Sequence, residues 1–362
     1  MRNLIRITII SVLILSNFLF VACIKDHRSK SPLPSQEESK LKDLKYILDQ
    51  AEDMSFIKSL IVIQNGNLVF ERYMNGGHAD LQNDIKSASK SILSALLGIA
   101  IRDGYVESID QKVIRFFPEY DLGDLDPRLF DLTIRHLIMM RSGFAIRETG
   151  QAYEDLNNSS DWIKHILNLR FASNPGEKFN YLSFNTHILS AIITKATGKS
   201  TLEYAEAVLF LPLGIKNVKW DQDPNGYYIG GWGISLKAWD LAKFGLLYLN
   251  DGVYEGKRIL PTEWIRESTI ERTGMVGTYY SRFWDNSYGY GYLWWVKRIG
   301  GNIDIPFAQG HAGQRIAVFK KVKAIMVAQT NAMVNVSTSH KQHRAVDQLL
   351  FEDISEYLLK YY

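Results

Sequence analysis

The residues with the clearest chemical potential are serines that a lysine follows three positions later. This spacing occurs at Ser39–Lys42, Ser55–Lys58 and Ser87–Lys90. On a helix, residues i and i+3 lie on one face, so the lysine can approach the serine. A buried lysine with a lowered pKa can then accept the serine proton and leave a nucleophile for acyl transfer.

Ser87–Lys90 is the pair with the most favourable context. Ser39 lies in a polar stretch and Ser55 directly precedes an expected strand, whereas Ser87 opens a segment to Ile101 that is apolar on nearly all sides. Such a segment is predicted to be a buried helix, whose first N–H groups favour negative charge at Ser87. Taken alone, the pair is better explained as a serine at a helix start followed by a solvated lysine than as a nucleophile and its base. The assignment as a catalytic pair therefore depends on the rest of the chain.

Two later motifs complete a recognisable set. Residues 175–183 read Pro-Gly-Glu-Lys-Phe-Asn-Tyr-Leu-Ser, and residues 311–314 read His-Ala-Gly-Gln at the start of a predicted strand. In this order, and with blocks at 132–143, 230–245 and 288–295, they resemble the serine β-lactamase and DD-peptidase superfamily. The resemblance covers about residues 60–331 and is strongest to the class C and nylon-oligomer-hydrolase-like branch.

The resemblance implies an α+β fold of the β-lactamase/DD-peptidase type. In such a fold, an antiparallel sheet of N- and C-terminal strands is flanked by helices and interrupted by a mainly helical insertion. It implies that Ser87 is the nucleophile, that Lys90 and Tyr181 move its proton, and that the N–H groups of Ser87 and of Gln314, after Gly313, form the oxyanion hole.

Four further residues are predicted to contact the substrate. Ser183 stands where the second motif usually has asparagine, and Trp232 and Tyr290 are predicted to line the pocket. His311 opens the third motif, where β-lactamases carry Lys-Thr-Gly. We interpret it as a pocket wall that hydrogen-bonds to substrate, and a general-base role stays open.

No cofactor and no metal is expected. His340 and His343 have helical metal-ligand spacing, but without a third ligand nearby they are interpreted as a solvated face. The chain contains no Gly-x-Ser-x-Gly motif, which disfavours an α/β-hydrolase. A net charge of +3 gives no indication of nucleic-acid binding.

The leading functional hypothesis is hydrolysis of carboxylic esters or small amides. Without the third-motif lysine, a fixed cation for a substrate carboxylate is lost, which disfavours a β-lactamase or a DD-peptidase-type cell-wall enzyme. That enzyme class remains the first alternative, and a catalytically silent penicillin-binding-like protein the second. The physiological substrate and the oligomeric state cannot be predicted.

The N-terminal residues predict export. Arg2 and Arg6 precede an apolar stretch at 9–21, which indicates a signal peptide over residues 1–22. Cys23, the chain's single cysteine, follows Ala22 and resembles a lipidated bacterial lipobox cysteine, which would place the protein at the cell envelope on a membrane anchor. A plain signal peptide or an uncleaved anchor remains open.

The remaining organisation follows from composition and periodicity. Residues 23–40 are polar and contain proline, so they are predicted to be a flexible tether before a hydrolase domain at 41–362. Its helical subdomain is expected at about 105–225. Helices are predicted at 41–51, 87–101, 133–140, 161–167, 183–196, 201–210, 235–249 and 343–359, and strands at 60–63, 68–70, 288–296, 315–319 and 324–329.

Overall fold

The computed structural model describes residues 36–121, 125–274, 287–300 and 303–361. The chain divides into two compact units, Met1–Lys42 and Asp43–Tyr362, and the second contains all the candidate catalytic residues. The predicted signal peptide and Cys23 lie outside the described residues. Among the helices that are described, none is long and apolar enough to cross a membrane.

The predicted tether is wrong at its C-terminal end. Helix α1 spans Gln36–Asp53, so helical structure begins at Gln36 and not at Leu41. Glu37 and Glu38 occupy the first turn, where the unpaired backbone N–H groups favour negative charge.

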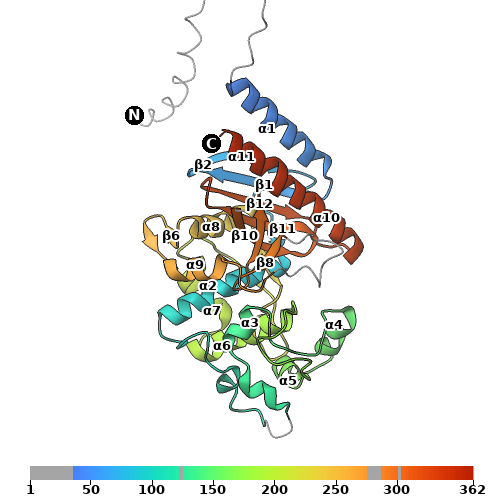
Figure 1. Cartoon of the computed structure of the whole chain (residues 1–362), viewed down its shortest axis with the longest axis vertical. Coiled ribbons are helices and arrows are strands. Elements are labelled where there is room, and N and C mark those ends of the chain that lie inside the picture. The colour runs from blue at the N-terminus through green and yellow to red at the C-terminus, as the bar shows by residue number, and fades with distance from the viewer. Residues whose placement is uncertain (1–35, 122–124, 275–286, 301–302, 362) are drawn as a thin grey trace, which may run out of the picture. The chain divides into compact units, whose positions relative to one another are not determined.

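A seven-stranded antiparallel sheet confirms the α+β fold, with the order β2-β1-β12-β11-β10-β9-β8 (Figure 1). Strands β1 and β2 come from the N-terminal part of this unit and the others from its C-terminal part, so both ends of the chain build the sheet. The strands are β1 (Ile57–Gln64), β2 (Asn67–Tyr73), β8 (Tyr288–Tyr290), β9 (Trp295–Ile299), β10 (Ile303–Gly310), β11 (Gln314–Phe319) and β12 (Ala324–Thr330).

Smaller elements fill the middle of the chain. Five short strands form two further sheets: β3 (Asn83–Asp84), β4 (Lys219–Trp220), β5 (Ile234–Leu236), β6 (Val253–Tyr254) and β7 (Lys257–Arg258). The helices between the two halves of the large sheet are α2 (Ser89–Arg102), α3 (Ile134–Ile138), α4 (Gly150–Asn157), α5 (Trp162–Leu167), α6 (Ser183–Thr197), α7 (Thr201–Ala205), α8 (Ala238–Leu249) and α9 (Thr262–Thr269). Helices α10 (Val336–Gln348) and α11 (Ser355–Tyr361) end the chain, separated by one π-helical segment, Leu349–Ile354.

Three predicted boundaries are corrected. The strand predicted at 288–296 is two strands, because Leu293 adopts a φ of 61° and the Gly291 N–H donates to Trp294 O at 2.8 Å, which turns the chain. The helix predicted at 235–249 begins at Ala238, because Ser235 pairs in β5. The final helix begins at Val336, because the Asn335 side chain accepts the Thr338 N–H and caps it.

Helices cover both faces of the large sheet. Helix α8 packs so closely on β11 that a Cβ at Gly245 would lie 3.1 Å from Ile316 Cγ2. Successive strand residues point to opposite faces, so Phe319 lies on the other side of the sheet. There Phe319 and Phe307 contact Phe351 of the C-terminal helical segment.

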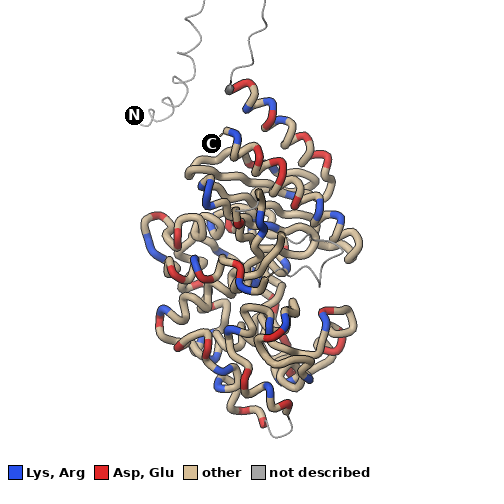
Figure 2. Tube along the Cα trace, viewed as in Figure 1, with Lys and Arg blue, Asp and Glu red and all other residues tan. Residues whose placement is uncertain are grey.

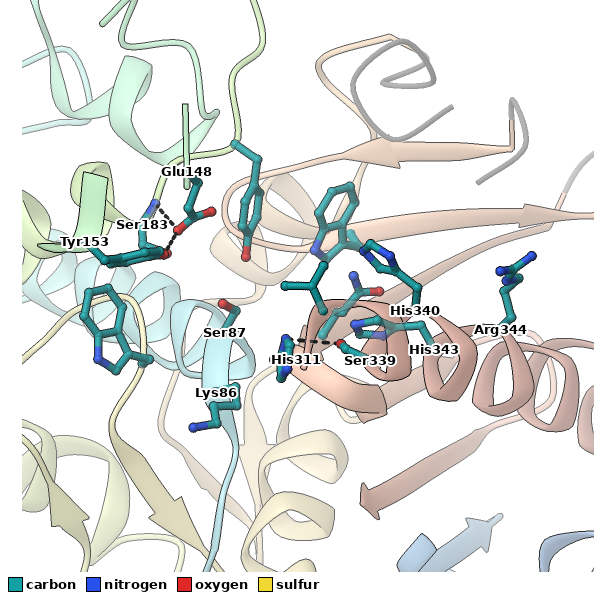
Figure 3. A pocket seen from close by; sticks show the side chains of 16 residues that line it. Lys86, Ser87, Glu148, Tyr153, Ser183, His311, Ser339, His340, His343 and Arg344 are labelled. Atoms are coloured by element: carbon teal, nitrogen blue, oxygen red, sulfur yellow. Dashed lines mark hydrogen bonds between the residues drawn. The ribbon is translucent and has the colours of Figure 1, made fainter. Parts of the chain in front are cut away.

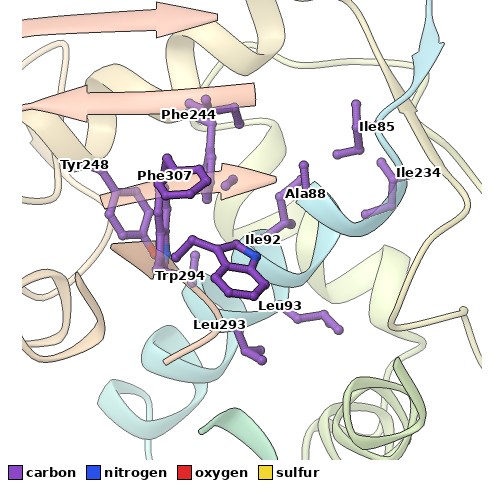
Figure 4. Packing of buried hydrophobic residues seen from close by; sticks show 14 of the residues in the cluster. Ile85, Ala88, Ile92, Leu93, Ile234, Phe244, Tyr248, Leu293, Trp294 and Phe307 are labelled. Atoms are coloured by element: carbon purple, nitrogen blue, oxygen red, sulfur yellow. The ribbon is translucent and has the colours of Figure 1, made fainter. Parts of the chain in front are cut away.

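Helix α2 is the buried helix that the sequence predicted. Its residues 89–100 are all buried, and Figure 4 shows Ile92 and Leu93 among the large side chains of the core. Nearby, Trp294 stacks on Phe244 with 6.1 Å between ring centroids. A helix enclosed on all sides has little freedom to shift, so it holds the preceding turn with Ser87 in a defined place.

Charged residues are mixed over the unit. Figure 2 shows basic and acidic residues distributed among the helices and loops of Asp43–Tyr362, in keeping with the small net charge of +3. The interior is largely apolar, and Lys90 and Arg315 are among its few buried charged side chains.

Candidate active site

Ser87 lies in a single 3₁₀ turn, Lys86–Ala88, immediately before α2. The sequence predicted Ser87 as the first residue of the helix, but the α-helix itself begins two residues later, at Ser89. Lys86 adopts a φ of 52°, a left-handed conformation that is uncommon for a residue with a side chain. The Lys86 N–H donates to Asp84 Oδ1 at 2.8 Å, which helps to hold the turn that presents Ser87.

Lys90 is the buried partner of Ser87. Its Nζ atom lies 2.8 Å from Ser87 Oγ and donates to Gly231 O, also at 2.8 Å. Burial lowers the pKa of Lys90 to about 8, and the negative charge of Glu148 partly opposes that shift. The amine is therefore held against the hydroxyl and can lose its proton near neutral pH.

Tyr181 lies close to Lys90, whose Nζ atom is 5.0 Å from the centre of the phenol ring. The ring stacks on Trp295 with 5.4 Å between centroids. Burial and the charge of Glu148 raise the pKa of Tyr181 well above its usual range, against a smaller opposite effect of its hydrogen bond with Ser87. At neutral pH Tyr181 is therefore a proton donor, and Lys90 is the better acceptor.

These side chains open onto a pocket of about 400 Å³ (Figure 3). Of the predicted site residues, Ser87, Tyr181, Ser183, Trp232 and His311 line it, and Lys90 lies behind Ser87. The other lining residues are Lys86, Glu148, Tyr153, Trp295, Gln309, Gly310, Val336, Ser339, His340, His343 and Arg344.

Tyr290 does not line the pocket, so this prediction is wrong. Its side chain is 1% exposed and packs edge-on against Trp295, with 4.8 Å between centroids, and against Phe179. The turn after β8 decides this, because it brings Trp295 and not Tyr290 to the pocket wall. Tyr290 instead supports the ring of Tyr181 from behind, at 6.1 Å.

Gln314 and Gly313 also lie outside the pocket. Gln314 begins β11, an interior strand, and its buried amide nitrogen donates to Thr330 O at 3.0 Å. The pocket is instead lined by Gln309 and Gly310 at the end of β10 and by His311, which follows directly. At Gly310 a Cβ would lie 2.0 Å from Ile85 O, so only glycine allows this close approach to the chain leading to Ser87.

His311 forms part of the wall, but its ring nitrogens face protein groups. Nε2 lies 3.0 Å from Val334 O, which can only accept, so Nε2 carries a proton. Nδ1 lies 3.1 Å from the Ser339 hydroxyl, whose oxygen also accepts the Ala312 N–H. Protein groups therefore occupy both ring nitrogens of His311. In this arrangement neither nitrogen is free to hydrogen-bond to a substrate, as was predicted, or to act as a general base.

Glu148 is the main site residue that sequence reasoning missed. It precedes α4, and its Oε1 atom accepts the Ser183 N–H at the start of α6 at 3.1 Å as well as the Tyr153 hydroxyl (Figure 3). Its charge raises the pKa of both Lys90 and Tyr181. No local spacing distinguishes Glu148, because its partners come from α4 and α6.

The pair His340 and His343 is not a solvated face. Both side chains are partly buried and line the pocket from α10. Burial lowers the pKa of His343 well below its ordinary value, and the Arg315 guanidinium reinforces the effect. Within the described residues, no group of three or more histidine, cysteine or acidic side chains is arranged to hold a metal ion.

The chain belongs to the beta-lactamase family, whose sequence profile matches residues 58–351. It is 25% identical to the 6-aminohexanoate-dimer hydrolase of Paenarthrobacter ureafaciens over 231 residues, which span 60% of this chain and 58% of that protein. A Bacillus anthracis protein provisionally named 6-aminohexanoate-dimer hydrolase has a similar structure, with a TM-score of 0.70, 21% identity, and coverage of 86% of this chain and 82% of that one.

A second similar structure is EstCE1, described as a hydrolase with promiscuous acyltransferase activity. The TM-score is 0.65 at 17% identity, with 86% of this chain and 99% of that one covered. These likenesses confirm the family and fold expected from the three motifs. Hydrolases are among the relatives, and the family is one of serine hydrolases.

Proposed function

We propose that this protein cleaves carboxylic esters or small amides through an acyl-enzyme on Ser87. The observation that carries the proposal is the 2.8 Å approach of Lys90 Nζ to Ser87 Oγ in a buried site. With a pKa of about 8, roughly a tenth of the molecules hold a neutral Lys90 at pH 7. A neutral amine at that distance can take the serine proton.

In the proposed mechanism, Lys90 accepts the proton of Ser87 as Oγ attacks the substrate carbonyl carbon. Tyr181, still protonated, donates its proton to the departing alcohol or amine, and the Lys90 ammonium restores it. Water then takes the place of the leaving group: neutral Lys90 accepts a proton from the water as its oxygen attacks the acyl carbon, and the Lys90 ammonium gives that proton to Ser87 Oγ as the acid departs. Lys90 thus accepts a proton at the start of both half-reactions, and the second one restores Ser87.

The proposed oxyanion hole differs from the sequence-based one. One donor remains the Ser87 N–H, and the second comes from residues 309–311, at the end of β10 and the start of the turn after it, since these residues border the pocket and Gln314 does not. Backbone donors of this kind stabilise the charge that develops on the carbonyl oxygen.

Ester or amide hydrolysis is favoured over a β-lactamase or cell-wall peptidase activity. The third motif has His311 where β-lactamases have lysine, and its ring nitrogens are engaged by Val334 and Ser339. The relatives named for 6-aminohexanoate dimers and for promiscuous acyl transfer support the same preference. A silent binding protein is disfavoured because Ser87, Lys90 and Tyr181 are together and in reach of one another.

A substrate panel tests the proposal. We expect the purified protein to hydrolyse 4-nitrophenyl esters of short acids, and its kcat/KM for the best ester or anilide to exceed that for a chromogenic cephalosporin. Faster turnover of the cephalosporin would instead support the cell-wall alternative. No turnover of any compound, together with no covalent adduct on serine, would support the silent protein.

We also propose that the mature protein is a lipoprotein of the cell envelope. The support is the single Cys23 at the end of an apolar stretch. In a bacterial host, the wild-type chain is expected to partition into the detergent phase and Cys23→Ser to lose both lipidation and this partitioning. Unchanged processing and membrane association in Cys23→Ser would refute the anchor and leave the hydrolase proposal intact.

A further inference from the structure

Tyr181 lies in a segment without regular secondary structure. Residues 175–182 belong to no helix or strand, and α6 begins directly after them at Ser183. The ring of Tyr181 packs on Trp295 and Tyr290, but apolar packing is not directional. A proton donor must lie within hydrogen-bond reach of the atom that it serves, so the backbone on either side of Tyr181 has to be fixed as well.

One buried residue, Met140, fixes the backbone on both sides of Tyr181. Its carbonyl oxygen accepts the Asn180 N–H at 2.8 Å, and its sulfur atom, Sδ, accepts the Leu182 N–H at 3.4 Å. Sδ also lies 3.6 Å from Asn185 Nδ2, in the first turn of α6. The chain around Tyr181 is therefore tied to Met140 at two backbone positions and one side chain.

Met140 itself has an unusual backbone conformation. It follows α3 and has a φ of 55°, in the left-handed region that glycine adopts at little cost. Its N–H donates to Leu137 O at 3.1 Å, and its side chain is fully buried. A residue with a side chain is disfavoured in this conformation, so the outlier points to a use of that side chain.

The sulfur of Met140, and not only its bulk, serves the Leu182 N–H. A buried backbone N–H needs an acceptor, and leaving it unpaired is costly. A thioether sulfur is a weak acceptor on a flexible, unbranched side chain. Leucine would fill a similar volume without an acceptor. The Leu182 N–H would then have to move to find another partner, and Tyr181 would move with it.

We infer that Met140 is a positioning residue for Tyr181, which holds the phenol within reach of Ser87 and of the leaving group through its carbonyl oxygen and its sulfur. The inference rests on the proposed hydrolase activity, in which Tyr181 protonates the leaving group. Met140 does not line the pocket. Its loss should therefore weaken proton donation and leave substrate binding unchanged.

The test compares two esters that differ in how much they need a proton donor. Phenyl butyrate and 4-nitrophenyl butyrate form the same butyryl-enzyme, so a difference between their kcat/KM values arises before deacylation. Phenol, with a pKa of about 10 like the tyrosine side chain, is a poorer leaving group than 4-nitrophenol and gains more from general acid catalysis.

Met140→Leu should lower the ratio of the phenyl to the 4-nitrophenyl kcat/KM about tenfold, because a displaced phenol is a less effective proton donor. The KM for 4-nitrophenyl butyrate should change little. Met326→Leu is the matched control. Met326 is also fully buried, but it lies in β12, where no residue lines the pocket. The same exchange there should leave the ratio at the wild-type value.

Met140→Gln should restore part of the ratio that Met140→Leu loses. Its amide oxygen can accept the Leu182 N–H. Its amide nitrogen can donate to Asn185 Oδ1, which is buried without a hydrogen-bond partner among the described residues. A role of Met140 as bulk alone would give glutamine no such advantage over leucine.

A double variant shows whether Met140 acts through Tyr181. Tyr181→Phe removes the proton donor and should lower the ratio at least as far as Met140→Leu does. Adding Met140→Leu to Tyr181→Phe should lower it no further, because no phenol remains to be positioned.

Four results would overturn the inference alone. They are a wild-type ratio in Met140→Leu, an equal fall in Met326→Leu, no recovery in Met140→Gln, and a further fall when Met140→Leu is added to Tyr181→Phe. If Met140→Leu does not fold, norleucine incorporated for methionine replaces the sulfur by a CH₂ group of similar shape, and an unchanged ratio in that protein would equally overturn it. If the wild type cleaves neither ester, the proposed function itself fails, so the two failures are distinguishable.

Discussion

Ser87→Ala is expected to abolish covalent labelling by a fluorophosphonate and to reduce ester turnover at least ~10⁴-fold, since the attacking oxygen is removed. The wild type should be labelled at one residue, and peptide mapping should place the adduct on Ser87. The side chain of Ser87 lies in the 3₁₀ turn before α2 and reaches the pocket, so its loss leaves the core unchanged. The variant should therefore keep the thermal stability of the wild type to within about 1 kcal/mol.

Ser89→Ala is the matched control for this experiment. Ser89 lies two residues further along, is fully buried, and its hydroxyl has no hydrogen-bond partner among the described residues. This variant should be labelled and active like the wild type. An adduct on Ser39, Ser55 or Ser89, or full activity in Ser87→Ala, would refute the assignment of the nucleophile.

Lys90→Met is expected to slow turnover by roughly two or more orders of magnitude, because methionine keeps most of the apolar stem and removes the proton acceptor. Tyr181→Phe should have an effect of similar size, since it removes the proton donor and keeps the ring that stacks on Trp295. The two residues serve one proton path, so the double variant should be little worse than either single variant. Fully additive losses would indicate that they act independently.

The pH profile distinguishes Lys90 from a histidine as the base. Only neutral Lys90 can accept the serine proton, so kcat/KM should rise with pH and level off above its pKa of about 8. Glu148 raises that pKa, and Glu148→Gln should therefore move the inflection to lower pH. An inflection near the ordinary histidine value that does not respond to Glu148→Gln would contradict Lys90 as the base.

Features that depend on short stretches of chain were predictable from the sequence. The buried character of α2 follows from its continuous apolar residues, and Lys90 approaches Ser87 because three residues separate them near a helix start. The hairpin of β1 and β2 turns at Asn65 and Gly66, which both adopt positive φ. The order of the three motifs indicated the family and therefore the antiparallel sheet.

Only the tertiary structure decided which residues surround the pocket. The turn after β8 places Trp295, and not Tyr290, in the pocket wall. The pairing order of the sheet places the end of β10, and not Gln314 of β11, at the pocket beside Ser87. Glu148 and Arg344 come from segments distant from the motifs. Side-chain proximity across a pocket depends on how whole elements pack, whereas local spacing reports only neighbours on one helix or strand.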